Sequence, residues 1–97
     1  MASMPGDFSE TRPADEEIQK ICDEVKPQVE SKTGRNFDIF NALLYRKQIV
    51  NGNNFLIKVY VGGSYYIHIM VYQNLSGEKT VTGVQEGHSK DDPLIPF

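Results

Sequence analysis

The 97-residue sequence predicts an α+β fold in which one long helix packs on an antiparallel sheet. Three observations lead to this prediction. Apolar residues recur at helical spacing within residues 14–34, and two cleanly alternating segments lie within residues 54–72. The turns between the later segments are too short for the crossovers that parallel strands need. With 39% apolar residues the chain can bury one modest core, so we expect a single domain over residues 1–97.

The composition argues against several classes of partner. The net charge is −3 and the ten Lys and Arg residues are scattered, so we expect no nucleic-acid partner. The N-terminus lacks the features of a signal peptide, and no run of residues approaches a membrane span. We therefore expect a cytoplasmic protein with no membrane partner. The only cysteine, Cys22, cannot form an intrachain disulfide, which fits a reducing compartment.

The first element is predicted to be a helix that follows an arm. Residues 1–13 carry two prolines, a glycine and no periodicity, so we expect an extended and weakly held arm. Residues 14–34 combine an apolar stripe with acids in the first turn and a glycine at the end, which favours a helix. Pro27 should bend this helix without breaking it. The stripe consists of Ile18, Ile21, Cys22, Val25 and Val29.

Residues 37–86 are predicted to form the sheet. The first strand has apolar residues at both odd and even positions. We therefore expect a bulge within residues 42–44 that changes which of these positions face the core. In the next two strands the even positions, His68 among them, should face outward. A last strand is expected over residues 80–85, followed by an irregular tail at 87–97. The odd positions should face the core, and they are Phe55, Ile57, Val59, Val61, Tyr65, Ile67, Ile69 and Val71.

The strongest turn signal is the pair Asn51 and Gly52. This pair favours a two-residue type I′ hairpin, in which both central residues have positive φ. Ile49 and Val50 precede it and leave aliphatic side chains beside a loop tip. From the residues alone they are either the buried end of a strand, which β-branched residues favour, or an apolar surface offered to a partner.

Few residues in the chain are suited to catalysis. Cys22 lies in the helix stripe, where a buried thiol behaves as a small hydrophobe. One cysteine with the two separated histidines His68 and His88 does not make a zinc site. We therefore expect no enzyme activity, no catalytic residue, no metal and no cofactor. A small hydrolase that uses Cys22 and His68 is the enzymatic alternative.

Read with its neighbours, the stretch Gln48-Ile49-Val50-Asn51-Gly52 resembles the Gln-x-Val-x-Gly motif of the cystatin superfamily. The similarity covers nearly the whole chain, which looks like a stefin, the disulfide-free cytosolic branch. Further matching stretches are Met4-Pro5-Gly6 in the arm, Pro13 to Lys32 in the helix, Asn53 to Val59 after the motif, Leu75 with Gly77 in a second hairpin, and Lys90-Asp91-Asp92 with Phe97 in the tail.

The resemblance implies the cystatin fold, in which one long helix packs across a bent antiparallel sheet of four to five strands. It also implies a reversible, tight-binding, non-covalent inhibitor of papain-like cysteine proteases such as cathepsins. The arm and two hairpins would block the active-site cleft, with at least Val50 and Gly52 exposed at the centre. The implied protease-binding residues are Met4, Pro5, Gly6, Gln48, Ile49, Val50, Asn51, Gly52, Leu75 and Ser76.

Two alternatives accompany this interpretation. A non-inhibitory cystatin-like scaffold would bind some other protein through the same edge. Stefins can also exchange the helix and its adjoining strands when the first hairpin opens. Because Asn51 and Gly52 favour the closed turn, we expect mainly a monomer, with a domain-swapped dimer as the second form. The second hairpin often carries Leu-Pro in stefins, whereas this chain has Leu75 and Ser76.

Overall fold

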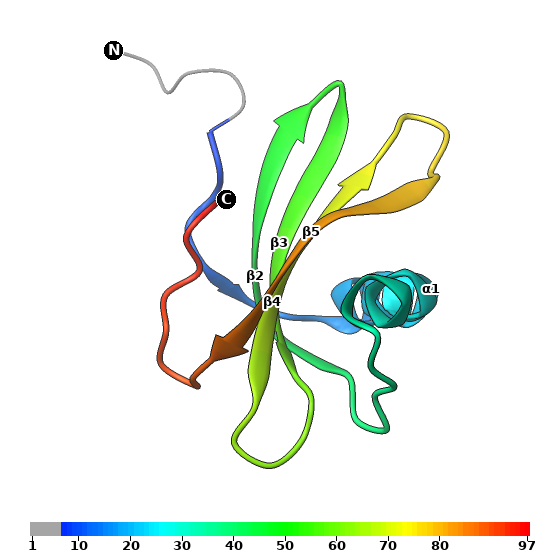
Figure 1. Ribbon diagram of the computed structural model, residues 1–97. Helices are drawn as coiled ribbons and strands as arrows, with labels where there is room; N and C mark the ends of the chain where they lie inside the picture. Colours follow the sequence, from blue (N-terminus) through cyan, green and yellow to red (C-terminus); the bar gives the residue numbers. More distant parts are fainter. Residues whose placement is uncertain (1–6) are drawn as a thin grey trace.

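The computed structural model describes residues 7–97 and confirms the predicted fold class, because one helix packs against a five-stranded antiparallel sheet (Figure 1). The sheet order follows the chain, β1-β2-β3-β4-β5. In Figure 1 the helix lies on one side of the sheet and the C-terminal tail, residues 89–97, lies on the other. The elements are β1 (Arg12–Pro13), α1 (Glu16–Thr33), β2 (Asn41–Val50), β3 (Gly52–Tyr60), β4 (Tyr66–Gln73) and β5 (Lys79–His88).

Helix α1 is capped at both ends. The Asp15 carboxylate accepts a hydrogen bond of 3.0 Å from the Ile18 N–H at the start of the helix. Gly34 ends the helix with a φ of 71°, and its N–H donates to the Glu30 carbonyl at 2.9 Å. The helix continues through Pro27. All five residues of the predicted stripe are buried against the sheet.

Two glutamines of α1 make hydrogen bonds to the sheet backbone. Gln28 donates to the Lys79 carbonyl at 3.0 Å and accepts from the Val81 N–H at 2.8 Å, at the start of β5. Gln19 accepts from the Ala42 N–H at 2.8 Å and donates to the carbonyl two residues earlier at 3.0 Å. Each amide thus bonds backbone groups as a neighbouring strand would, and the helix is tied to both β2 and β5.

The predicted bulge is present, since the register between β2 and β3 shifts between Ala42 and Leu44. The odd positions that were predicted to face the core from β3 and β4 are buried with α1, and Val61 packs against them; they are Phe55, Ile57, Val59, Ile67, Ile69 and Val71. The prediction for Tyr65 is wrong, because this residue precedes β4 in the β3–β4 turn and its side chain is exposed. Strand β5 also continues to His88, beyond the predicted end of the sheet at residue 86.

The outer face of the sheet is covered, which contradicts the prediction that its even positions face solvent. His68 is 1% exposed and Lys58 is 3% exposed. Leu94 of the tail is buried against Leu56 and Met70, and the Lys58 ammonium donates to a tail carbonyl at 2.6 Å. The tail has no regular structure, as predicted, but it forms a second layer on the sheet. This layer is needed because β3 and β4 have apolar residues at both odd and even positions, and so on both faces.

Residues 7–13 are held more firmly than the weakly held arm that the sequence predicts. β1 pairs with β2, and Phe8 forms an antiparallel bridge with Gln48. The Ser9 N–H donates to the Lys47 carbonyl at 2.7 Å. The edge of β2 presents backbone groups that need partners, and this part of the arm supplies them.

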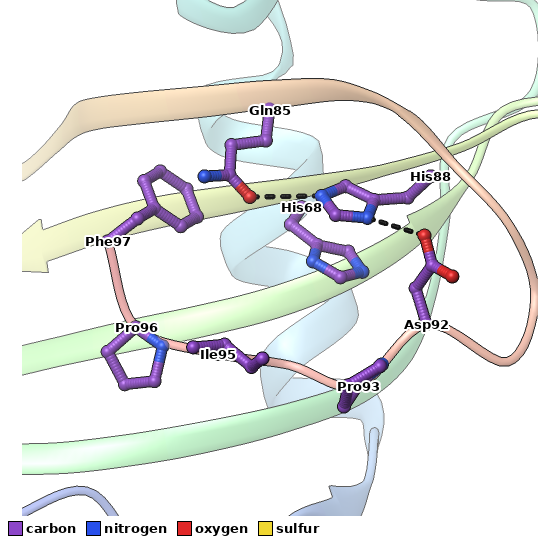
Figure 2. Close-up of a pocket in the computed structure, with 8 residues that line it drawn as sticks. All are labelled: His68, Gln85, His88, Asp92, Pro93, Ile95, Pro96 and Phe97. Carbon is purple, nitrogen blue, oxygen red and sulfur yellow. Dashed lines mark hydrogen bonds and ion pairs between the residues drawn. The ribbon is translucent and has the colours of Figure 1, made fainter.

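His68 stacks on His88 beneath the tail (Figure 2). The ring centroids are 3.6 Å apart and the rings are within 9° of parallel. His88 also contacts Asp92 at 2.8 Å and Gln85 at 2.9 Å, whereas His68 Nε2 has no hydrogen-bond partner within residues 7–97. Burial lowers the pKa of His68 to about 4, and the charges of His88 and Lys58 act in the same direction against an opposing effect of Asp92.

We expect the protein to lose stability as the pH falls from about 6.5 towards 4. His68 has an ordinary pKa of 6.5 in the unfolded chain but a pKa of about 4 in the fold, so the unfolded state binds more protons in this window. The loss should reach about 1 to 2 kcal/mol at pH 5, measured by thermal unfolding at pH 5 and pH 7. His68→Gln should reduce this pH dependence, and an unchanged dependence in the variant would contradict the assignment.

Candidate protein-binding edge

Two hairpin loops and the start of the described chain lie towards the same end of the molecule, at the upper edge in Figure 1. We call the two loops, residues 48–53 and 74–77, the loop edge. Between the loops lies a groove of about 370 Å³. Its lining residues are Ile49, Val50, Gly52, Asn53, Gln73, Asn74, Leu75 and Gly77. No residue in either loop carries a charged side chain.

The apolar side chains of the loop edge are exposed. Ile49 is 68% exposed, Val50 is 41% exposed and Leu75 is 79% exposed. Ser76 and Asn51 are also exposed. The exposure of Ile49 and Val50 excludes the buried strand end that the residues alone left open. Large apolar side chains gathered at one exposed edge are typical of a protein-binding surface.

Gly52 is buried, which contradicts the expectation that it is exposed at the centre of the surface. A Cβ atom at this position would lie 2.3 Å from the Gln73 carbonyl oxygen and 3.0 Å from the Tyr72 hydroxyl. The φ of Gly52 is 106°, a conformation that side-chain-bearing residues rarely adopt. The glycine therefore lets the first loop pack closely on β4.

The first hairpin does not contain the predicted type I′ turn. Its register pairs Val50 with Gly52, which leaves Asn51 at the centre of a three-residue connection. Within residues 7–97 positive φ is confined to glycines, so Asn51 does not adopt it. A three-residue connection needs positive φ only at its third residue, and Gly52 supplies it. The Tyr72 hydroxyl donates a hydrogen bond to the Asn51 carbonyl and ties the tip to β4.

The second loop is organised by Asn74. Its side-chain oxygen accepts hydrogen bonds from the Ser76 N–H at 3.0 Å and the Glu78 N–H at 2.9 Å. Its carbonyl accepts a third from the Gly77 N–H at 3.0 Å. These bonds fix the backbone that presents Leu75, without the proline that stefins often have in place of Ser76. Asn74 is not among the sequence-predicted site residues, although an asparagine just before a Leu-Ser-Gly turn is a signal for this kind of loop.

The sequence-predicted binding residues that fall within residues 7–97 lie together. Gln48, Ile49, Val50, Asn51, Gly52, Leu75 and Ser76 all lie on the loop edge. Gln48 is half-buried, and its side-chain oxygen accepts a hydrogen bond of 2.8 Å from Asn54. Met4, Pro5 and Gly6 lie outside the described residues.

The hydrolase alternative is wrong. Cys22 is fully buried between α1 and the sheet, and this burial raises the pKa of its thiol to about 12. His68 lies on the opposite face of the sheet, so the two side chains cannot form a dyad. No group of His, Cys, Asp and Glu side chains within residues 7–97 could hold a metal ion. In the same part of the chain, no helix is long and apolar enough to cross a membrane.

The fold and the loop edge together define a small helix-on-sheet protein whose two hairpin loops present exposed apolar side chains. The family described as the cystatin domain matches residues 6–93. The chain therefore belongs to the cystatin family.

Three relatives align over nearly their whole length. Cystatin-A of Felis catus is 46% identical over 97 residues, covering 97% of this chain and 99% of its own. Cystatin-B of Oplegnathus fasciatus is 43% identical over 100 residues, covering all of both chains. A Sus scrofa protein named leukocyte cysteine proteinase inhibitor 1 is 44% identical, covering 97% of this chain and 94% of its own. These similarities place the chain among the stefin-type cystatins.

We expect Gly52→Ala to displace the first hairpin and to lower the free energy of unfolding by about 2 to 4 kcal/mol, because it adds a collision with Gln73 to the strain of positive φ. Gly77→Ala is the matched control. Its φ is 89°, but nothing lies within 4 Å of the added Cβ, so only the strain remains. Thermal unfolding of both variants measures the difference. Equal losses would contradict the close packing of Gly52 on β4.

Proposed function

We propose that this protein is a reversible, tight-binding, non-covalent inhibitor of papain-like cysteine proteases of the cathepsin type. The observation that carries the proposal is the uncharged loop edge, on which Ile49, Val50 and Leu75 are exposed on loops fixed by hydrogen bonds. The name of the Sus scrofa relative, a cysteine proteinase inhibitor, supports the same function. Family membership supports an inhibitor in place of an enzyme.

The proposed mechanism is steric blockage of the protease cleft. The first loop, with Val50 at its centre, would lie beside the catalytic cysteine and histidine. Leu75 would anchor the second loop on the primed side. Because both loops are preformed, binding orders few residues, and more of the contact free energy remains as affinity. An interface of this kind typically buries about 1,600 Å² in total.

The N-terminal residues would complete the blockage on the non-primed side. Met4 and Pro5 would occupy specificity pockets, and Gly6 would let the backbone pass close to the protease nucleophile because it has no side chain. The chain would then lie in the cleft without presenting a peptide bond for cleavage. Inhibition would require no chemistry from the inhibitor itself.

We further propose that the inhibitory form is a monomer in the cytoplasm. The single cysteine, Cys22, is buried and free, which suits a reducing compartment. In a domain-swapped dimer the hairpin at Asn51 would open into one continuous strand. That opening would remove the first loop, so such a dimer should inhibit poorly.

The central test is Val50→Asp, which should raise the inhibition constant for papain at least tenfold, about 1.4 kcal/mol. A carboxylate in the centre of an apolar contact would lose its water without gaining a partner. The melting temperature should change little, because Val50 is exposed. Ile39→Asp is the matched control, since Ile39 has the same exposure, 41%, and lies near Gly62 of the β3–β4 turn, away from the loop edge.

Equal inhibition by Val50→Asp and the unmodified protein would contradict the assignment of the first loop. If the unmodified protein failed to inhibit papain at all, the alternative of a non-inhibitory scaffold would replace the proposed function. The control should inhibit normally.

Deleting residues 1–6 should accelerate release from papain while leaving the association rate within about a factor of ten. Ordering a chain segment costs about 1 to 2 kcal/mol per residue, which contacts made after docking must offset. Stopped-flow inhibition measures both rates. Gly6→Arg should act more strongly than the deletion, because it adds a collision near the nucleophile. An unchanged release rate after the deletion would show that these residues make no contribution.

A further inference from the structure

A second, smaller core joins the two ends of the described chain on the outer face of the sheet. Its buried residues are Leu56, Met70 and Leu94, and Phe8 packs against them. Leu94 belongs to the tail and Phe8 to the segment that precedes β1. The two ends of the described chain thus share one apolar cluster. Figure 1 shows the tail beside the first described residues.

Arg46 links the same two segments through its charged group. Its Nε donates a hydrogen bond of 2.8 Å to the Ser9 carbonyl, and its Nη1 donates one of 2.8 Å to the Leu94 carbonyl. The guanidinium carbon also lies 5.8 Å from the centre of the Phe8 ring. The planar fork of arginine can make two directed hydrogen bonds and a ring contact at the same time, which a lysine ammonium cannot reproduce.

These contacts fix the place where the N-terminal residues leave the sheet. Phe8 is bridged to Gln48, the first residue of the loop edge, and the Ser9 hydroxyl accepts a hydrogen bond of 3.0 Å from the Lys47 N–H. Arg46 holds Ser9 from the other side. The backbone at residues 8–9 is therefore set beside the first hairpin before any partner binds.

We propose that Arg46 is a positioning residue for protease binding and that Leu94 of the tail is its support. Arg46 contacts no protease in this proposal, which rests on the proposed function. It acts through Phe8 and Ser9, which anchor residues 1–6 beside the cleft-blocking loop. A fixed anchor leaves fewer residues to order on the protease and raises the effective concentration of the N-terminal residues at their pockets.

The test is a double-mutant cycle on release from papain, which combines Arg46→Met with deletion of residues 1–6. In the full chain, Arg46→Met should accelerate release about fivefold to tenfold. In the truncated chain the same substitution should change release by less than about twofold, because the residues that it positions are gone. Arg35→Met is the matched control. It removes an exposed ion pair with Glu86 and should leave release unchanged in both backgrounds.

Amide hydrogen exchange provides a measurement that needs no protease. Arg46→Met should speed exchange at the Ser9 N–H, which donates to Lys47, more than at the buried amides of β3. Arg46→Lys keeps the positive charge but not the fork. It should accelerate release in the full chain even if Arg46→Met does not fold.

The outcomes separate this proposal from the proposed function. Equal acceleration by Arg46→Met or Arg46→Lys in both backgrounds would show a general effect on the fold and overturn the positioning role. Unchanged release in the full chain would also overturn it, while inhibition by the unmodified protein would leave the proposed function intact. Failure of the unmodified protein to inhibit papain would overturn the proposed function and the positioning role together.

Discussion

The contact between the apolar stripe of α1 and the inner face of the sheet is the interaction on which the rest of the structure depends. Ile18, Val25 and Val29 are at most 2% exposed in this contact, and burying a side chain of this size contributes about 1.5 to 3 kcal/mol. The helix runs across the strands, so one element covers several of them at once. The hairpins extend from this supported region, and their loops project from the end of a sheet that is already held in place.

The loop edge keeps its shape through contacts of its backbone. Its apolar side chains are not needed for this and remain exposed. In the first loop, Gly52 packs against β4 and the Tyr72 hydroxyl donates to the Asn51 carbonyl, while the Val50 side chain remains exposed. In the second loop, the side chain of Asn74 holds the turn while Leu75 remains exposed. The residues that stabilise each loop therefore differ from those to which we assign protease binding. This separation allows an exposed residue to be substituted without unfolding the loop that carries it.

The sequence predicted the helix, the odd-position core and the bulge near Ala42, because periodicity, helix caps and apolar parity are local signals. It failed where a distant segment decides the outcome. His68 was expected to face solvent, yet Leu94 and the tail around it bring a second layer over that face. Leu56 and Met70 indicate this second layer in the sequence, because they are apolar residues at even positions and must also be buried. The role of Gly52 could not be predicted, because its close approach to Gln73 depends on the β3–β4 pairing and not on the motif.

The glutamine bonds from α1 also affect how the sheet meets other chains. β1 and β5 are the edge strands, and an open edge offers backbone groups to which another strand can add. The side chain of Gln28 hydrogen-bonds one backbone carbonyl and one N–H at the start of β5. Gln19 makes the same two kinds of bond at the start of β2, where the two-residue strand β1 does not pair with it. Side-chain amides from one helix thus shield parts of both borders of the sheet. Exposed aliphatic loops favour association between chains, and strand addition at an open sheet edge would turn such association into aggregation. The glutamine bonds reduce this risk because they leave fewer free backbone groups at the edges.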